Sequence, residues 1–290
     1  MTGTTEEFVA HRNLLFTVAY EMLGSAADAE DVLQETWLRW AEVDRDSVRE
    51  PRAYLVRITT RLALNRLRTA ARRRETYVGP WLPEPLLTVP DVAEDVELAD
   101  SVSTAMLLVL ETLTPTERAV FVLREVFAVG YDEIAAAVDR TPDAVRQIAH
   151  RARGHVEARR PRTRVTAAER DAVFARFIQA ASTGDLQSLM DVLAPDVVLL
   201  TDGGGVTKAA LKPIHGSEKV LRFLAAVGAG GAAAVDVVQV NGGPALRMFN
   251  ETGLDTLGTF LIEDGLVTAI YFVRNPHKLA RLEEATALER

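Results

Sequence analysis

Arginine is concentrated in two blocks of this chain, and these blocks constrain its fold more than any other feature. The first block, Arg52–Arg74, contains eight arginines, no acidic residue, no glycine and no proline, and it follows Pro51. This composition predicts a long helix that opens at the proline. One arc of about 80° would then hold Arg57, Arg61, Asn65, Arg68 and Arg72. Leu55, Ile58 and Leu62 share a different arc, so the helix can pack on one side and present cations on the other.

The second block, Arg140–Arg164, contains eight arginines and two acids. Its sequence predicts a helix-turn-helix: a short helix over Asp132–Val138, a tight connection, and a helix from Thr141-Pro142 to about Val156. One arc of the second helix would carry Arg146, His150 and Arg153. Thr141, Arg146 and Gln147, near the start of that helix, are placed as major-groove contacts usually are. Many helical hairpins share this pattern, so the motif alone leaves a purely structural alternative.

The net charge of −8 hides this distribution. The segment Leu82–Glu117, which separates the two blocks, has eight acids and no base. Two basic regions joined by an acidic bridge can bind a polyanion at two places, even in an acidic protein. The alternative is a pair of solvated helix faces.

Four segments follow from these patterns. Residues 5–75 and 101–160 are predicted to be all-helical, and residues 76–100 form a linker interrupted by glycine and prolines. Residues 166–290 are predicted to be α+β, with helices on a curved antiparallel sheet. The expected strands are Val197–Thr201, Val235–Val240, Thr256–Glu263 and Leu266–Val273, the last two joined by a turn at Asp264-Gly265.

Several functional classes are disfavoured. The chain has no cysteine, which excludes disulfides, a thiol nucleophile and cysteine-ligated zinc. The five histidines are too dispersed for a metal site, and no cofactor motif is present. No apolar run approaches about 18 residues, and Met1–Val9 has no basic segment. We therefore expect a cytoplasmic protein without a membrane partner.

A third polar surface lies before the first arginine block. In the helix around Ala29–Trp37, the polar face would carry Asp31, Gln34 and Glu35 beside the apolar Leu33 and Trp37. An acidic face beside an arginine helix suggests a protein partner on one side and nucleic acid on the other. An exposed face with no partner is the alternative.

Both helical segments resemble one family. AEDVLQETWLRW and PRAYLVRITTRLALNRLR are similar to region 2 of the extracytoplasmic-function (group IV) sigma factors of the sigma-70 family. LTPTERAVFVLREVF and YDEIAAAVDRTPDAVRQIAHRARGHV are similar to region 4. The resemblance implies an RNA polymerase sigma factor. By it, region 2 would contact the β′ clamp helices through Asp31, Gln34 and Glu35, and region 4 would meet the β flap.

The resemblance also assigns the DNA contacts. The −10 element would be bound by Arg57, Arg61, Asn65 and Arg68. The −35 element would be bound by Thr141, Arg146, Gln147, His150 and Arg153.

Three short motifs resemble the signatures of the ECF41 and SigJ-like group: Trp81–Pro85, Asp202–Gly205 and Asn275–Leu279. That group carries a fused SnoaL-like domain of the NTF2-like fold, so no separate anti-sigma factor is required. Trp81 is unfavourable in water, which predicts that the linker docks on this domain. The expected interdomain residues are Trp81, Pro83, Pro85, Asp202, Gly203, Gly204, Gly205, Asn275 and Pro276. The family's basic residue directly after the glycines is replaced here by Val206, with Lys208 two places on.

An enzyme is the weaker interpretation of the third domain. Asp202 and His215 could form an acid–base pair in an NTF2-like cavity. More simply, Asp202 can accept backbone N–H groups in its turn. The alternative function is therefore a DNA-binding regulator fused to a small-molecule-binding or cyclase-like domain, whereas we expect a non-enzymatic sigma factor.

Overall fold

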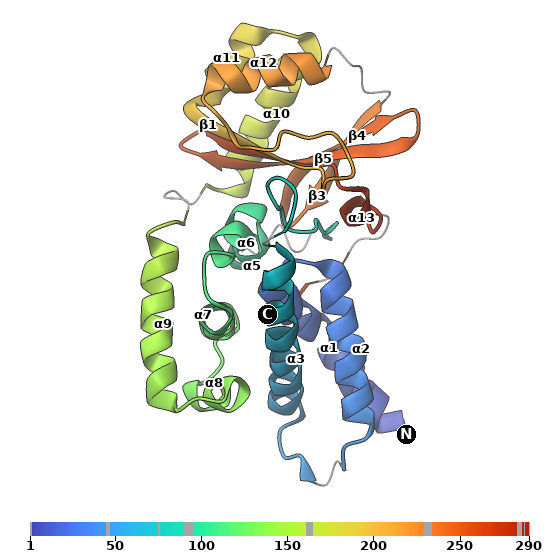
Figure 1. Cartoon of the computed structure of the whole chain (residues 1–290), viewed down its shortest axis with the longest axis vertical. Helices are drawn as coiled ribbons and strands as arrows, with labels where there is room; N and C mark the ends of the chain where they lie inside the picture. Colours follow the sequence, from blue (N-terminus) through green and yellow to red (C-terminus); the bar gives the residue numbers. More distant parts are fainter. Residues whose placement is uncertain are drawn as a thin grey trace. The chain divides into compact units, whose positions relative to one another are not determined.

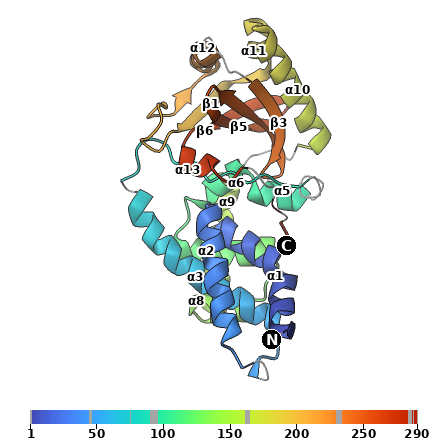
Figure 2. The same cartoon turned by 90° about the vertical axis from the view of Figure 1, so that its right-hand side faces the viewer.

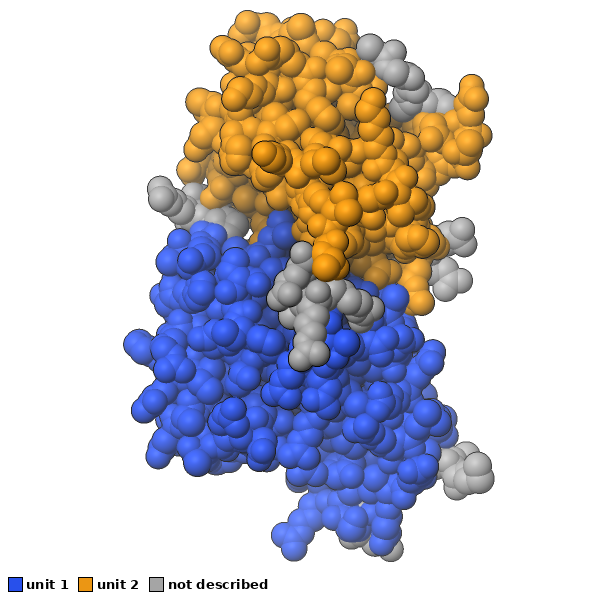
Figure 3. Space-filling view, viewed as in Figure 1, with its two compact units in different colours: residues 1–75, 106–160, 287–290 blue, residues 76–105, 161–286 orange. Residues whose placement is uncertain are grey.

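The structure is a computed structural model that describes residues 2–44, 47–74, 76–89, 96–160, 165–228, 234–282, 286 and 288–289. These residues form two units, coloured in Figure 3, and each is described by itself. Unit 1 comprises residues 1–75, 106–160 and 287–290. Unit 2 comprises residues 76–105 and 161–286, so the linker is grouped with the third domain.

Unit 1 begins with three helices, α1 (Thr2–Leu23), α2 (Ala26–Ala41) and α3 (Pro51–Arg74), as the sequence predicts (Figure 1). Ser25 caps α2 by accepting the Asp28 N–H at 3.2 Å. The apolar faces of the three helices meet in a core in which Leu15, Trp40 and Leu55 are fully buried.

The rest of unit 1 contains the predicted helix-turn-helix. The chain runs through α6 (Thr104–Leu110), α7 (Pro115–Phe121), the π-helical turn η2 (Val122–Val126), α8 (Tyr131–Val138) and α9 (Pro142–Glu157). Thr114 and Glu117 form a capping box at the start of α7, and Thr141 caps α9. Asp139 adopts a left-handed conformation between α8 and α9, which makes the turn tight.

Unit 2 is a six-stranded sheet with helices on both sides. Its helices are α5 (Val96–Val102), α10 (Ala167–Thr183), α11 (Leu186–Val192), α12 (Ser217–Gly228) and α13 (Pro276–Leu279). Its strands are β1 (Leu193–Asp202), β2 (Ile214–His215), β3 (Ala234–Val240), β4 (Gly243–Asn250), β5 (Gly253–Glu263) and β6 (Leu266–Val273). The spatial order is β2-β1-β6-β5-β4-β3. Helices α10, α11 and α12 cover one face, where Phe174, Phe177 and Ile270 form part of the core (Figures 1 and 2).

The expectation of an antiparallel sheet is wrong at one pairing, because β1 and β6 run parallel, with Asp202 beside Val273. A helix and four strands separate β1 from β6 in the chain, which is long enough for a crossover connection. The sheet is therefore mixed. Strands β2 and β4 were not predicted, whereas the hairpin turn at Asp264-Gly265 is confirmed by positive φ angles at both residues.

Among the described residues, no helix is both long and apolar enough to cross a bilayer.

Candidate nucleic-acid interface and linker dock

The predicted −10 face of α3 is largely open within unit 1. Asn65 and Arg68 are exposed, and the Arg68 guanidinium lies 3.4 Å from Asn65 Oδ1. Arg57 lies over the ring of Tyr54, 4.9 Å from its centroid. The side chain of Arg72 lies outside the described residues.

Arg61 differs from its neighbours because it is bound to the helix-turn-helix. Its Nη2 donates to the carbonyl oxygen of Ala136 at 2.7 Å, and its Nε donates to that of Ala137 at 3.4 Å. Both carbonyls belong to the last turn of α8, where the helix dipole favours a cation. One predicted −10 contact is therefore engaged by the block predicted to bind the −35 element.

Arg118 makes a second contact between the first three helices of unit 1 and the helices that follow the linker. This contact was not predicted from the sequence. It is buried in α7, its Nε donates to the Glu21 carbonyl oxygen at the end of α1 at 3.0 Å, and it pairs with Glu111. Burial lowers the pKa of Arg118 to about 9. An arginine in the middle of a seven-residue helix gives no sequence signal for burial, since arginines usually lie on the surface.

The predicted −35 face of α9 is exposed, whereas Val145, Ala149, Ala152 and Val156 are buried. Arg146 pairs with Asp143 within the helix and also lies over the Tyr131 ring. Arg153 pairs with Glu125 at 2.6 Å. The side chains of Gln147 and His150 are exposed on the same side of the helix. Thr141 has its hydroxyl engaged in the helix cap, so it is less available for a base.

The predicted protein-binding face of α2 is also exposed, and it contains a residue that the prediction omitted. Asp31, Gln34 and Glu35 are exposed, although Asp31 also pairs with Arg66 of α3. Leu38, one turn further on, is 62% exposed. Single exposed leucines are common on protein surfaces, so Leu38 gains weight only from its position on the same face as Asp31, Gln34 and Glu35.

In unit 2, the linker and the third domain meet at a buried carboxylate. Asp202 is fully buried at the end of β1. Its Oδ1 accepts the Tyr77 hydroxyl at 2.6 Å and the Gly204 N–H at 3.0 Å. Its Oδ2 accepts the Leu82 N–H at 2.9 Å and Lys278 Nζ at 2.7 Å. We call this cluster the linker dock; two of its four donors come from the linker.

Lys278 completes the linker dock, and the prediction did not name it. Its Nζ also donates to the Leu82 carbonyl oxygen and lies 4.4 Å from the Trp81 ring centroid and 5.0 Å from that of Tyr77. Its place in the Asn275–Leu279 motif was the signal that could have identified it. Burial raises the pKa of Tyr77, and the bond to Asp202 raises it further, so the phenol stays protonated and donates.

The backbone just after Asp202 lies so close to neighbouring segments that a side chain would not fit there. Gly204 has φ +61°, and a Cβ there would lie 2.2 Å from Asn275 Nδ2 and 3.2 Å from the Tyr77 hydroxyl oxygen. Asn275 is buried and donates to that hydroxyl at 2.9 Å. Gly204 therefore lets the loop, the linker and the Asn275 turn meet without a side chain between them.

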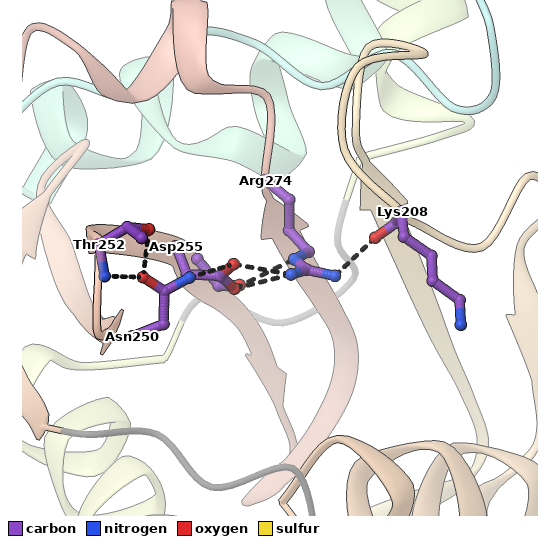
Figure 4. A network of polar contacts seen from close by, with 6 residues as sticks. Lys208, Asn250, Thr252, Asp255 and Arg274 are labelled. Carbon is purple, nitrogen blue, oxygen red and sulfur yellow. Dashed lines mark hydrogen bonds and ion pairs between the residues drawn. The ribbon is translucent and has the colours of Figure 1, made fainter.

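Arg274 holds the glycine loop against the sheet (Figure 4). Its N–H donates to the Asp202 carbonyl oxygen at 2.7 Å, its Nη1 donates to the Lys208 carbonyl oxygen at 2.5 Å, and its Nη2 pairs with Asp255 at 2.8 Å. Burial by itself would raise the pKa of Asp255, but hydrogen bonds from Arg274 and Thr256 outweigh it and lower the pKa. Lys208 contributes its backbone, and its ammonium group points away from Arg274 (Figure 4).

The linker then continues along the open edge of β3. The Asn241 N–H donates to the Leu86 carbonyl oxygen at 2.9 Å, and the Thr88 N–H donates to the Gln239 carbonyl oxygen at 3.0 Å. Pro83 and Pro85 are buried in this segment, whereas Pro276 is exposed. Of the three prolines predicted to be interdomain residues, the two in the linker are therefore buried and Pro276 is not.

The acid–base pair considered for catalysis is not assembled. His215 is exposed in β2 opposite Val198, and Asp202 lies four residues further along β1, about 13 Å away at the usual rise of a strand. The carboxylate of Asp202 is occupied by the linker dock.

Comparisons with known proteins agree with this geometry. Residues 8–73 match the family model of sigma-70 region 2, and residues 103–156 match that of sigma-70 region 4. The chain is 37% identical over 290 residues to the ECF RNA polymerase sigma factor SigJ of Mycobacterium tuberculosis, covering 94% of this chain and 92% of that one. It is 32% identical over 273 residues to the probable ECF RNA polymerase sigma factor SigI of the same species, covering 93% and 92%. The crystal structure of SigJ superposes with a TM-score of 0.78 at 33% identity, covering 96% of this chain and 99% of that one.

Proposed function

This chain belongs to the extracytoplasmic-function RNA polymerase sigma factors, and we propose that its NTF2-like domain controls promoter binding through the linker dock. The partners are the RNA polymerase core and promoter DNA, which places its action in the cytoplasm. We propose no enzymatic step, and control from within the chain requires no separate anti-sigma factor.

Four surfaces have separate tasks in this proposal. Asp31, Gln34, Glu35 and Leu38 of α2 bind the β′ clamp helices. The face of α3 that carries Arg57, Arg61, Asn65 and Arg68 binds the −10 element, where the cations lie along phosphates and Asn65 reaches a base. In α9, Arg146, Gln147 and His150 enter the −35 major groove, while Thr141 and Arg153 support the helix. Region 4 also meets the β flap.

The observation that carries the proposal of internal control is the bond from Arg61 to the last turn of α8. A residue that must contact the −10 element is held by region 4 in this arrangement. For Arg61 to reach DNA, region 4 has to separate from α3, and the buried Arg118 must then lose its bond to the Glu21 carbonyl. The closed arrangement is thus a resting state that binding to polymerase and promoter has to disrupt.

The linker dock supports the proposal that the third domain acts through the linker. A linker of 25 residues, from 76 to 100, could reach about 85 Å if it were free and fully extended. Docking of Tyr77, Leu82, Leu86 and Thr88 on the third domain removes most of that reach. The third domain therefore limits how far regions 2 and 4 can separate.

The test is run-off transcription by RNA polymerase core with three forms of the chain: wild type, Trp81→Ala, and a chain truncated after residue 165. The proposal expects both changes to alter promoter output. Unchanged output from both would show that the third domain does not act through this linker. Loss of core binding by the altered chains would have to be excluded by a pull-down with the purified core.

A further inference from the structure

A cavity of about 130 Å³ lies in unit 2 between α5, the start of α10 and the β4–β5 part of the sheet. Its lining includes Arg170, Phe260, Ile262 and Tyr271; Phe260 and Ile262 lie on the face of the sheet that α10 covers, and Tyr271 lies on the opposite face. The linker dock is formed by other residues, so this cavity is a second feature of the same domain.

Arg170 is the feature that points to a ligand. Its Nε is buried and has no hydrogen-bond partner among the described residues. Its ion pair with the exposed Asp171 is long, at 3.9 Å. Burial lowers the pKa of Arg170, and the charge of Asp171 offsets this only in part. Arg170 lines the cavity, so an anionic oxygen there could pair with its guanidinium group, and a carboxylate fits the guanidinium fork.

The rest of the wall selects the body of such a ligand. A cavity of about 150 Å³ is known to hold a benzene-sized molecule, and this cavity is slightly smaller, so the apolar body of a ligand can be no larger than a single ring. Phe260 packs against the rings of Phe174 and Phe177, which makes that wall rigid. Asp100 also lines the cavity, and its negative charge disfavours a second anionic group on the ligand.

We propose that this cavity binds a small monocarboxylate with an apolar body, such as an aromatic acid, through Arg170. Binding at this site would also affect the control of promoter binding proposed above, and this part of the inference rests on that proposed function. Ser103, Thr104 and Ala105 line the cavity at the junction of α5 and α6, and Thr104 and Thr259 share a hydrogen bond of 3.2 Å. Helix α6 continues directly into region 4. A bound acid would therefore stabilise the chain segment that joins α5 to α6.

The first experiment is calorimetric titration of the full-length chain with benzoate and with benzamide, a neutral molecule of nearly the same shape. Wild type should bind benzoate at least tenfold more tightly than benzamide. Arg170→Met should lose this preference, and Arg176→Met, which removes an exposed arginine from the same helix, should keep it. The site is refuted if benzoate does not saturate wild type, or if both probes bind equally.

A second measurement uses only wild type, in case Arg170→Met fails to fold. Hydrogen exchange over residues 99–105 should slow several-fold with saturating benzoate and stay unchanged with benzamide, and phthalate should bind more weakly than benzoate. Unchanged exchange with bound benzoate would overturn the coupling to α6. Neither experiment contains polymerase or DNA, so their failure leaves the sigma-factor function standing.

Discussion

Lys278 and Asp202 form a buried ion pair, with 2.7 Å between Nζ and Oδ2 and with the linker on both sides of it. Breaking a buried pair by removing one partner costs about 3–5 kcal/mol, because the other charge stays buried. The contact is therefore strong enough to decide whether the linker remains docked.

We expect Lys278→Met to release the linker. Limited proteolysis within residues 76–89 should accelerate at least tenfold, because Asp202 loses its cation and Trp81 its contact with the ammonium group. Lys219→Met changes an exposed lysine of α12, and a protease should cleave this variant at the wild-type rate. Equal cleavage of all three proteins would contradict the importance of the ion pair.

Asn65→Ala and Arg61→Ala should both weaken promoter opening more than binding to the polymerase core. Only Arg61→Ala should also loosen region 4 from α3, because Asn65 makes no contact with α8 among the described bonds. Permanganate footprinting of the −10 element and hydrogen exchange of α8 measure the two effects. If each variant lost core binding in step with opening, the assignment of this face to DNA would be wrong.

Arg146→Ala should lower discrimination at one position of the −35 element by about 1–3 kcal/mol, the value of a bidentate contact to a base. Arg151 is exposed on another side of α9, so Arg151→Ala should weaken all sequences alike. Binding of the chain, with core polymerase, to single-base variants of the element measures both. Unchanged discrimination would make Arg146 a phosphate contact.

Leu38→Asp should weaken binding to the polymerase core at least tenfold, since burying a leucine contributes about 1.5–3 kcal/mol. Val9 is 60% exposed on α1 and provides the matched control, Val9→Asp, which should bind almost normally. Fluorescence anisotropy with labelled chain and purified core gives both constants. Similar losses in both variants would point to a general effect of the added charge.

The pair of Asp255 with Arg274 should make part of the stability depend on pH. Because the folded-state pKa of Asp255 is lowered, its contribution is present above about pH 4, the usual pKa of a free aspartate, and is lost as the pH falls through the folded value. Asp255→Asn should therefore destabilise the chain by about 1–3 kcal/mol at pH 7, and the difference from wild type should shrink progressively as the pH falls below about 4. Thermal unfolding measures this, and Glu35→Gln, at the exposed pair of Glu35 with Arg39, should have little effect at either pH.

The sequence predicted the helices well because their caps are local. Ser25, Thr114 and Thr141 each cap the helix that the pattern placed after them. The partners of Asp202 could not be derived in this way, because Tyr77 and Lys278 are far from it in the chain. The parallel pairing of β1 with β6 brings Lys278 close, and docking of the linker brings Tyr77. Strand β4 was missed because its glycine, proline, arginine and asparagine obscure the alternation that marks a strand.

The linker segment that follows the dock also protects the sheet. Leu86 and Thr88 occupy one end of the β3 edge, while Val235 and Val237 on the same strand are 54% and 56% exposed. A fragment beginning at residue 166 would leave that whole edge unpaired, with two valines beside it, and such edges pair with other chains. Fragments of the third domain made without residues 76–89 should therefore self-associate more readily than the full chain, in which the linker occupies one end of this edge.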